Sequence, residues 1–361
     1  MDVAPFYLFP QPRPILMNPF RFLALLLLAI SITAAASAPL PDGLYAEITT
    51  ERGVVVAEIY FQKAPMTAAS FVGLAEGTLG PAPRKPFYDG LKFHRVVPGF
   101  VVQGGDPTGT GSGDAGYSYP DEIVPGLRFD KPGVLSIANS GSDTNGSQFC
   151  FILASAPRLN YAYPTFGQVV RGLEILPLIK QGDTMRVKII RLGKLAKAFR
   201  ADEKTFAKLV ARAPRLPLPF FDDADDIAAG EQPWYVKNLE TKLANLQRFV
   251  GARAYLRLFE KFEPDFPGQT MQQNIDAYRA KYKMSPKTTL AAYFADSDQW
   301  LLATGARPGL TLPDVKRREG VRPTAEKSED AKKEKIRVYY AALEVINSLI
   351  FQMEPQGPIK N

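Results

Sequence analysis

An arginine among large apolar residues is the first feature of this sequence that could support chemistry. Arg95 lies in the stretch FHRVVPGFVVQGGD, residues 93–106. In an extended strand Arg95 would share one face with Phe93 and Val97, while His94 would point to the other side. A guanidinium keeps its charge and presents several N–H donors in one plane. Beside apolar side chains, such a group suits a neutral substrate that carries a carbonyl. A surface salt bridge, with the arginine stem packed on apolar neighbours, is the alternative interpretation.

The histidine and cysteine counts exclude several classes of site. The chain has one histidine, His94, and one cysteine, Cys150. A single cysteine excludes an intrachain disulfide, a Cys-rich zinc site and an iron–sulfur cluster. We interpret His94 as a structural residue rather than a general base, because strand alternation turns it away from Arg95. Cys150 reads as a buried pocket position rather than a redox thiol. We expect no metal and no cofactor.

Two further stretches accompany the first: SIANSGSDTNGSQF at 136–149 and LNYAYPTFG at 159–167. Together the three resemble the cyclophilin family of peptidyl-prolyl cis–trans isomerases, over roughly residues 46 to 193. The pattern FHRxxxGFxxQGGD is long and specific, and the run NGSQF at 145–149 follows where that family has it. The segments GTGSGDAG at 109–116 and PDE at 120–122 are similar to the bacterial branch.

The resemblance implies a mainly β fold, a closed eight-stranded antiparallel barrel capped by two helices, with a proline-binding groove on its outer face. Arg95 aligns with the catalytic arginine of the family. The apolar pocket for the proline ring aligns with Phe100, Val101 and Leu159. The positions that hold the substrate backbone align with Gln103, Ala138, Asn139 and Gln148. Two groove positions depart from the family: Cys150 stands where a phenylalanine is usual, and Tyr163 where many members have histidine. Arg158 occupies the position of a tryptophan found in some eukaryotic members.

These residue types suit isomerisation of an X–Pro amide, whose rotation is opposed by a barrier of about 18–20 kcal/mol. No covalent nucleophile or cofactor is needed. A donor aimed at the prolyl nitrogen stabilises the twisted transition state more than either planar ground state, and on the predicted face Arg95 is the only charged group with the reach. The predicted partners are unfolded or proline-containing polypeptides. The alternative is a non-catalytic proline-peptide-binding or chaperone module that uses the same groove, and Cys150 and Tyr163 keep it open.

The N-terminal segment resembles a secretory signal peptide. Arg21 precedes the apolar run 22–32, and small residues at 34–38 follow. We predict a signal peptide over residues 1–38, with Met17 as a possible start, and a retained membrane anchor as the alternative. Export to the periplasm or medium is therefore expected, with membrane contact only in transit. The net charge of +7 permits anionic partners, but export argues against nucleic acid.

Local patterns predict an isomerase domain over 44–195 and a helical domain over 200–361, whose function the sequence leaves open. In the first, short strands alternate with turns rich in glycine and proline. The expected strands are 44–49, 54–60, 92–97, 100–103, 133–137, 148–153, 166–170 and 187–192, and the expected helices are 64–76 and 172–180. In the second, apolar periodicity predicts helices over 201–211, 234–262, 270–282, 289–303 and 330–353. A role for this domain in holding clients near the groove is one possibility that the sequence raises.

Overall fold

The computed structural model describes residues 39–82, 84–215, 220–222, 233–259, 270–281, 283–313, 315 and 329–355. The predicted signal peptide over 1–38 lies outside the described residues. Asp42–Asn361 form one compact unit. None of the described helices has both the length and the apolarity that crossing a membrane requires.

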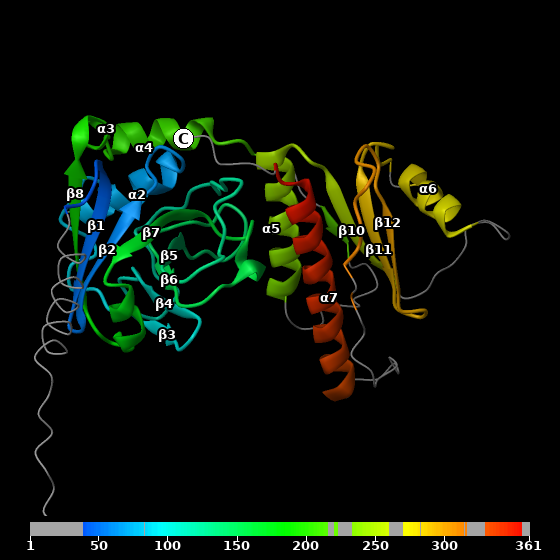
Figure 1. Cartoon of the computed structure of the whole chain (residues 1–361), viewed down its shortest axis with the longest axis horizontal. Coiled ribbons are helices and arrows are strands. Elements are labelled where there is room, and N and C mark those ends of the chain that lie inside the picture. The colour runs from blue at the N-terminus through cyan, green and yellow to red at the C-terminus, as the bar shows by residue number, and fades with distance from the viewer. Residues whose placement is uncertain are drawn as a thin grey trace, which may run out of the picture. The chain divides into compact units, whose positions relative to one another are not determined.

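Eight strands form one curled antiparallel sheet, in the order β3-β4-β6-β5-β7-β2-β1-β8 (Figure 1). Each lies within a few residues of its predicted position, because alternating β-branched segments between glycine-rich turns are strong local signals. The strands are β1 (Gly43–Thr50), β2 (Gly53–Ile59), β3 (Arg95–Val97), β4 (Val101–Gly104), β5 (Val134–Ile137), β6 (Phe149–Ile152), β7 (Thr165–Arg171) and β8 (Met185–Leu192).

The sheet is a half-barrel, so the prediction of a closed barrel was wrong. The segments just before the edge strands β3 and β8 are joined by one isolated bridge, Lys92 to Thr184, and by backbone hydrogen bonds such as that of the Phe93 amide to the Asp183 carbonyl at 2.9 Å. The strands β3 and β8 themselves are not paired and stand at the two ends of the strand order. Phe93 is fully buried in the core while Arg95 is exposed. The expectation that these two side chains share a face was therefore also wrong.

Helix α2 (Pro65–Glu76) is confirmed and packs into the core of the curled sheet. Proline stands at its start, and the Glu122 carboxylate accepts hydrogen bonds from the amides of Met66 and Thr67 at 3.0 and 2.7 Å. These bonds satisfy amides that the first turn leaves unpaired. Phe71 of α2 contacts three core aromatic rings with centroids 5.1–5.3 Å away: Tyr88, Phe149 and Phe166.

Shorter helices complete this part of the chain. The segment predicted as a helix over 172–180 is the 3-10 helix η2 (Leu173–Leu178), and a second 3-10 turn, η1 (Pro157–Leu159), carries a predicted pocket residue. After β8 come α3 (Gly193–Ala198) and α4 (Glu203–Arg212). Helix α4 was predicted, and Asp202 caps it by accepting from the Thr205 amide at 2.8 Å.

The C-terminal region mixes helices and strands, so the prediction of an all-helical domain was wrong. It contains a four-stranded sheet in the order β12-β11-β10-β9. Its elements are β9 (Phe221–Asp222), α5 (Pro233–Val250), β10 (Ala254–Phe259), α6 (Met271–Lys281), β11 (Thr289–Phe294), β12 (Gln299–Ala303) and α7 (Glu329–Met353). The helices α6 and α7 agree with the predicted ones, and α5 agrees with the first part of the predicted helix 234–262.

The last part of the predicted helix 234–262 and the whole of the predicted helix 289–303 contain strands instead, for identifiable reasons. Gly251, at φ +74°, ends α5, and β10 then alternates between buried and half-buried side chains. Strand β11 is buried along its whole length, and a fully buried strand has the same unbroken apolar run as a buried helix. The turn between β11 and β12 passes through Asp298 at φ +51°.

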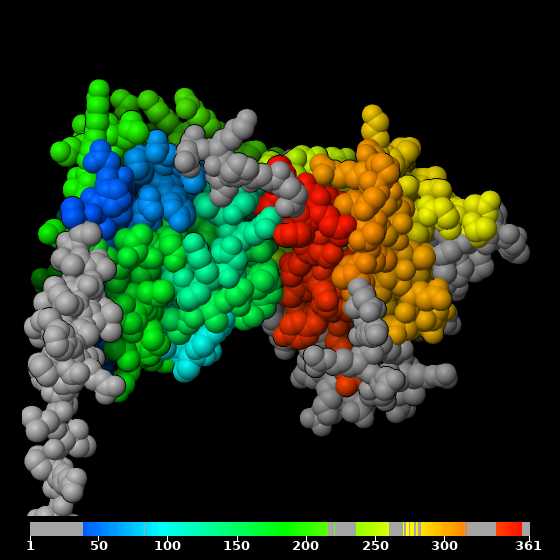
Figure 2. All heavy atoms as spheres, in the orientation of Figure 1, coloured from blue at the N-terminus to red at the C-terminus, as the bar shows by residue number. Residues whose placement is uncertain are grey.

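Helices α5 and α7 share one hydrophobic core with β10 and β11. Leu243 of α5, Leu256 of β10, Tyr293 of β11 and Ile346 of α7 belong to a single buried cluster. The space-filling view shows α7 in red and the β11–β12 region in orange, adjoining on one face (Figure 2). Ile123 and Tyr161, from the part of the chain that carries the curled sheet, belong to the same cluster. The C-terminal elements are therefore packed against the segments around these two residues.

Candidate active site

Three neighbouring strands bring Arg95, Gln103 and Cys150 side by side. Arg95 of β3 is paired with Gln103 of β4, and Gln103 is paired with Cys150 of β6. Residues paired directly across an antiparallel ladder lie on the same face of the sheet. The Arg95 Nη1 donates to Gln103 Oε1 at 3.1 Å. The hairpin thus fixes one side of an exposed guanidinium.

A chain of amide side chains continues from Gln103 to a glycine-rich loop. Gln103 Nε2 donates to Gln148 Oε1 at 2.9 Å. Gln148 Nε2 in turn donates to the carbonyls of Gly111 and Gly113, each at 2.9 Å. The two loop carbonyls can only accept, so they fix the Gln148 amide with its nitrogen toward the loop and its oxygen toward Gln103. Gln148 in turn fixes the Gln103 amide with its oxygen toward Arg95.

Asp106 organises the same glycine-rich loop. Its carboxylate accepts hydrogen bonds from the Thr108 amide at 2.7 Å, from the Thr108 hydroxyl at 2.8 Å and from the Gly111 amide. Burial acts to raise the pKa of Asp106, but these hydrogen bonds outweigh it and lower that pKa to about 2. The ionised carboxylate thus holds the loop that Gln148 contacts.

The predicted pocket residues form one apolar cluster beside Arg95. Val101 and Cys150 are buried in it, and three others pack against it while remaining partly exposed: Phe100, Leu159 and Tyr163. Leu159 is supplied by η1. An apolar, partly open cluster next to a fixed cation can accept a ring with a polar amide at its edge.

A second guanidinium stands at this pocket, which the sequence analysis missed. The Arg158 guanidinium carbon lies 4.3 Å from the centre of the Phe100 ring, and that of Arg95 lies 5.8 Å away. Both distances are within cation–π range. Arg95 is therefore not the only charged group with reach on this face. The signal was available, since Arg158 was noted at a position where related proteins carry an aromatic residue.

Cys150 is a buried residue, as predicted. Its side chain belongs to the pocket cluster, and burial raises its pKa to about 12, although the positive charge of Arg95 acts in the opposite direction. Burial also raises the pKa of the neighbouring Tyr163. Both groups are neutral at physiological pH. The floor is thus apolar, with a thiol in place of a large ring.

Ala138 and Asn139 lie where β5 leaves the sheet. The Ala138 amide donates to the Gln148 carbonyl at 2.9 Å. The Asn139 side-chain nitrogen donates to Asn145 Oδ1 at 3.1 Å and to the Ala162 carbonyl at 3.2 Å, and reaches Asp121 Oδ1 at 3.5 Å. The amide of Asn139 therefore ties together two segments that carry groove residues.

His94 lies beside Gln148 but outside the apolar pocket cluster. It is half-buried, and burial lowers the pKa of its imidazole; Arg95 acts in the same direction, while Asp106 and Gln148 act to raise that pKa. The ring is therefore neutral near pH 7. A neutral histidine outside the pocket cluster agrees with its interpretation as a structural residue.

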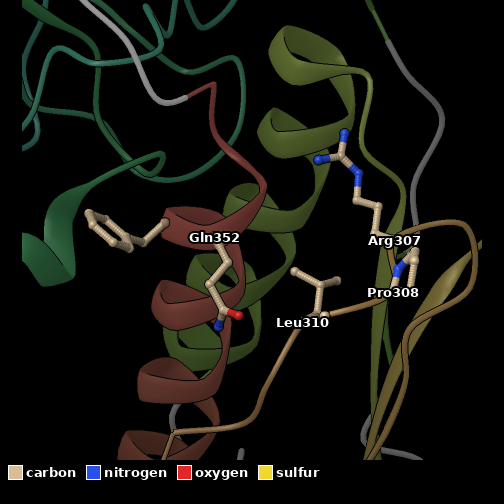
Figure 3. A pocket seen from close by; sticks show the side chains of 6 residues that line it. Arg307, Pro308, Leu310 and Gln352 are labelled. Carbon is tan, nitrogen blue, oxygen red and sulfur yellow. The ribbon is translucent and has the colours of Figure 1, made fainter.

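A hollow of about 550 Å³ lies in the C-terminal region, between the segment after β12 and the end of α7 (Figure 3). Arg307 and Gln352 are among the residues that line it. Arg307 donates to the Met353 carbonyl at 3.1 Å, and the Gln352 amide exchanges hydrogen bonds with the Thr311 backbone at 2.8 and 2.9 Å. Because these polar groups are already bonded to the protein, we assign no chemistry to this hollow.

Comparison with known proteins connects this geometry to one family. The family described as cyclophilin type peptidyl-prolyl cis-trans isomerase/CLD matches residues 45–194. Peptidyl-prolyl cis-trans isomerase A of Mycobacterium tuberculosis is 48% identical over 132 residues, which cover 35% of this chain and 72% of the relative. Peptidyl-prolyl cis-trans isomerase-like 1 of Homo sapiens is 40% identical over 147 residues, 40% of this chain and 82% of the relative. A Cryptosporidium parvum cyclophilin, crystallised in the presence of the dipeptide Ala-Pro, is 30% identical, with a TM-score of 0.36, over 42% of this chain and 99% of that one.

Proposed function

Because the chain belongs to the cyclophilin-type peptidyl-prolyl cis–trans isomerase family, we propose that it accelerates rotation about X–Pro bonds in exported polypeptides and assists their folding, with Arg95 as the catalytic group. The observation that carries the assignment of Arg95 is its position. An exposed guanidinium, bonded to Gln103 at 3.1 Å, stands at the edge of an apolar cluster that can accept a proline ring.

The chemistry follows from the loss of amide resonance during rotation. In the planar amide the nitrogen lone pair is delocalised, and breaking that resonance accounts for a barrier of about 18–20 kcal/mol. In the twisted transition state the prolyl nitrogen becomes pyramidal and basic. A donor on Arg95 then gains a hydrogen bond that neither planar isomer offers, and such a difference in binding lowers the barrier.

The other groove residues confine the rotation to one bond. Phe100, Val101 and Leu159 hold the ring, while Gln103 and Gln148 anchor the flanking backbone. The side chain of Asn139 is committed to the protein, so we assign its contact with substrate to its backbone. Cys150 and Tyr163 complete the pocket. The smaller floor at Cys150 buries less of the ring, so we expect weaker binding than a phenylalanine would give.

The test is a protease-coupled isomerisation assay with a short X–Pro peptide and the Arg95→Ala variant. Loss of a transition-state donor costs about 3 kcal/mol, or about a hundredfold in rate. A suitable control is Arg84→Ala, which removes an exposed arginine paired with Glu203, and which should leave the rate unchanged. A rate for Arg95→Ala equal to that of the unsubstituted protein would remove Arg95 from the mechanism. No acceleration by the unsubstituted protein would favour a proline-peptide-binding module.

The part of the proposal that concerns export rests on residues 21–38 and has its own test. A cationic residue, an apolar run and small residues occur there in the order that signal peptidase recognises. Expression of the full chain in a bacterial host should give a product that begins at Pro39 and is found in the periplasm or medium. A product that keeps its leader and sediments with membranes would replace export by anchoring.

A further inference from the structure

Helix α5 presents buried polar side chains to the two segments that form walls of the groove. We define the groove walls as residues 138–145, which carry Ala138 and Asn139, and residues 157–163, which carry Leu159 and Tyr163. We propose that Asn245 and Arg248 of α5 are positioning residues that hold both groove walls in the shape that binds substrate. This inference rests on the proposed function of the groove.

Arg248 fixes the first groove wall through Asp143. Its guanidinium pairs with the carboxylate in a bidentate manner, Nη1 to Oδ1 at 2.7 Å and Nη2 to Oδ2 at 3.0 Å. The Arg248 side chain is 1% exposed and that of Asp143 is 33% exposed, so water reaches this pair only from the carboxylate side. The Asp143 carboxylate also accepts from the Asp121 amide at 2.9 Å. The Ser142 hydroxyl donates to the Thr241 hydroxyl of α5 at 2.9 Å, so the loop is anchored to the helix at two neighbouring residues.

Asn245 bridges the first groove wall to the second. Its side-chain nitrogen donates to Asp121 Oδ2 and to the Tyr161 carbonyl, both at 2.9 Å, and the residue is fully buried. Asp121 is also fully buried and accepts from Asn145 at 2.7 Å, in the first groove wall. The oxygen that accepts from Asn145, Oδ1, also accepts from the Asn139 side chain, at 3.5 Å. A continuous polar path thus runs from α5 to a groove residue.

The backbone of both groove walls needs such support. Asp143 has φ +59° and Tyr161 has φ +64°, in the left-handed region that residues with a side chain avoid. Conformations of this kind cost about 1–3 kcal/mol each and persist where surrounding contacts determine them. The contacts of Arg248 with Asp143, and of Asn245 with Tyr161, are contacts of that type. Without them we expect the groove walls to relax toward ordinary backbone angles.

The kinetic consequence is specific. The groove walls hold the flanking backbone and the ring, whereas Arg95 lies on β3 and is fixed by Gln103. Loosening the groove walls should weaken substrate binding and leave the donor in place. A loss of binding that is equal in ground and transition states raises KM with kcat unchanged.

The experiment compares Arg248→Met with Arg191→Met in the full-length protein. Arg191 of β8 also pairs with a carboxylate in a bidentate manner, that of Glu76 at the end of α2, and none of its contacts in the described part of the chain is with a groove wall. KM and kcat are measured for a short X–Pro peptide by the protease-coupled assay, with a thermal melt for each variant. We expect Arg248→Met to raise KM about tenfold with kcat within about twofold, a change of about 1.4 kcal/mol. Arg191→Met should leave both constants within about twofold of the unsubstituted protein.

A merely structural role for Arg248 would give a different result. If the substitution only reduced the folded fraction, kcat would fall and KM would stay constant, and that outcome overturns the inference. An unchanged KM with full folding overturns it as well. Should Arg248→Met fail to fold, Asp143→Asn is the second variant, because asparagine tolerates the left-handed angle and the substitution removes the charge and one of the two acceptors of the pair. We expect it to raise KM about threefold, and an unchanged KM for this variant counts against the inference.

The outcomes separate this inference from the proposed function. If the unsubstituted protein does not accelerate isomerisation, the proposed function fails. If it does, and Arg95→Ala lowers kcat while Arg248→Met leaves KM unaltered, only the role of α5 fails.

Discussion

The hydrogen bond between Arg95 and Gln103 predicts a rate loss that can be measured separately from substrate contact. Replacing Gln103 by methionine keeps a side chain of similar length and removes the acceptor 3.1 Å from Arg95 Nη1. A hydrogen bond to a charged group contributes about 1.5–3 kcal/mol. Arg95 is exposed, so water replaces part of the lost bond and the lower figure applies. We therefore expect Gln103→Met to lower kcat/KM about tenfold, against about a hundredfold for Arg95→Ala.

A double-mutant cycle shows whether Gln103 acts through Arg95. The protease-coupled rate is measured for the unsubstituted protein, for each single variant and for the double variant. If Gln103 orients the guanidinium, Gln103→Met costs less once Arg95 is alanine, and the cost that remains measures its own contact with the substrate backbone. The matched control is Gln168→Met, because Gln168 lies on β7 and donates to the Pro132 carbonyl at 2.9 Å. An equal tenfold loss in both backgrounds would mean that Gln103 acts only through its contact with substrate and would refute the orienting role, as would no loss at all.

Three further predictions concern titrating groups. Burial raises the pKa of Cys150 to about 12, so a thiol reagent at about pH 8 should label it only after unfolding, and rapid labelling of the native protein would contradict its burial. Burial lowers the pKa of Lys242 to about 7, so between about pH 7 and 10 this amine is neutral in the folded state and protonated in the unfolded state. The free energy of unfolding should therefore rise with pH over this range, by up to about 1.4 kcal/mol per pH unit. Lys242→Met should flatten that rise, and an equal slope in both proteins would exclude Lys242 as its source. The pKa of Asp106 is lowered to about 2, so the ionised carboxylate stabilises the fold fully above about pH 4, and this stabilisation is lost as the pH falls toward 2. Asp106→Asn should reduce the loss of stability in acid, measured by chemical denaturation. An unaltered pH profile would mean that other groups cause the loss.

The strands of the curled sheet could be predicted because their signals are local. Alternation and glycine-rich turns lie within each segment, and β1 through β8 appear where these patterns occur. Closure of the sheet is not a local property. It depends on pairing between β3 and β8, which are far apart along the chain and stand at the two ends of the strand order. The family resemblance suggested closure, whereas the described residues supply one isolated bridge and a few backbone hydrogen bonds beside it.

The C-terminal strands were missed for a related reason. Segment 289–303 is apolar over most of its length, which fits a buried helix and a buried hairpin equally well. The choice is made by the parallel pairing of β11 with β10, whose partner residues are 35 positions apart along the chain. No periodicity within the segment reports such a partner. Helix α7, by contrast, has 25 residues with two kinds of face, and that pattern alone indicated a helix.

The groove was predicted from aligned motifs, and its supports were not. Arg95, Gln103 and Gln148 form one hydrogen-bonded chain, and the pocket residues form one cluster, as the motifs implied. The motifs did not reveal that Asn139 turns its amide into the protein. Nor did they reveal Asn245, which lies 124 residues from its partner Asp121. A contact between residues so far apart along the chain produces no short sequence motif around either residue.

The segments that α5 contacts nonetheless carry a mark of that contact in their own backbone. Of the four described non-glycine residues with positive φ, Asp143 and Tyr161 lie in the groove walls, and both are bonded by side chains of α5. A tyrosine at φ +64° is unfavourable alone, because its Cβ crowds the backbone where glycine would not. Such a backbone conformation is tolerated where a permanent contact stabilises it, as the Asn245 side chain does at the Tyr161 carbonyl. The isomerase groove of this chain is therefore built for a protein in which α5 is in place, and its substrate affinity should depend on that helix.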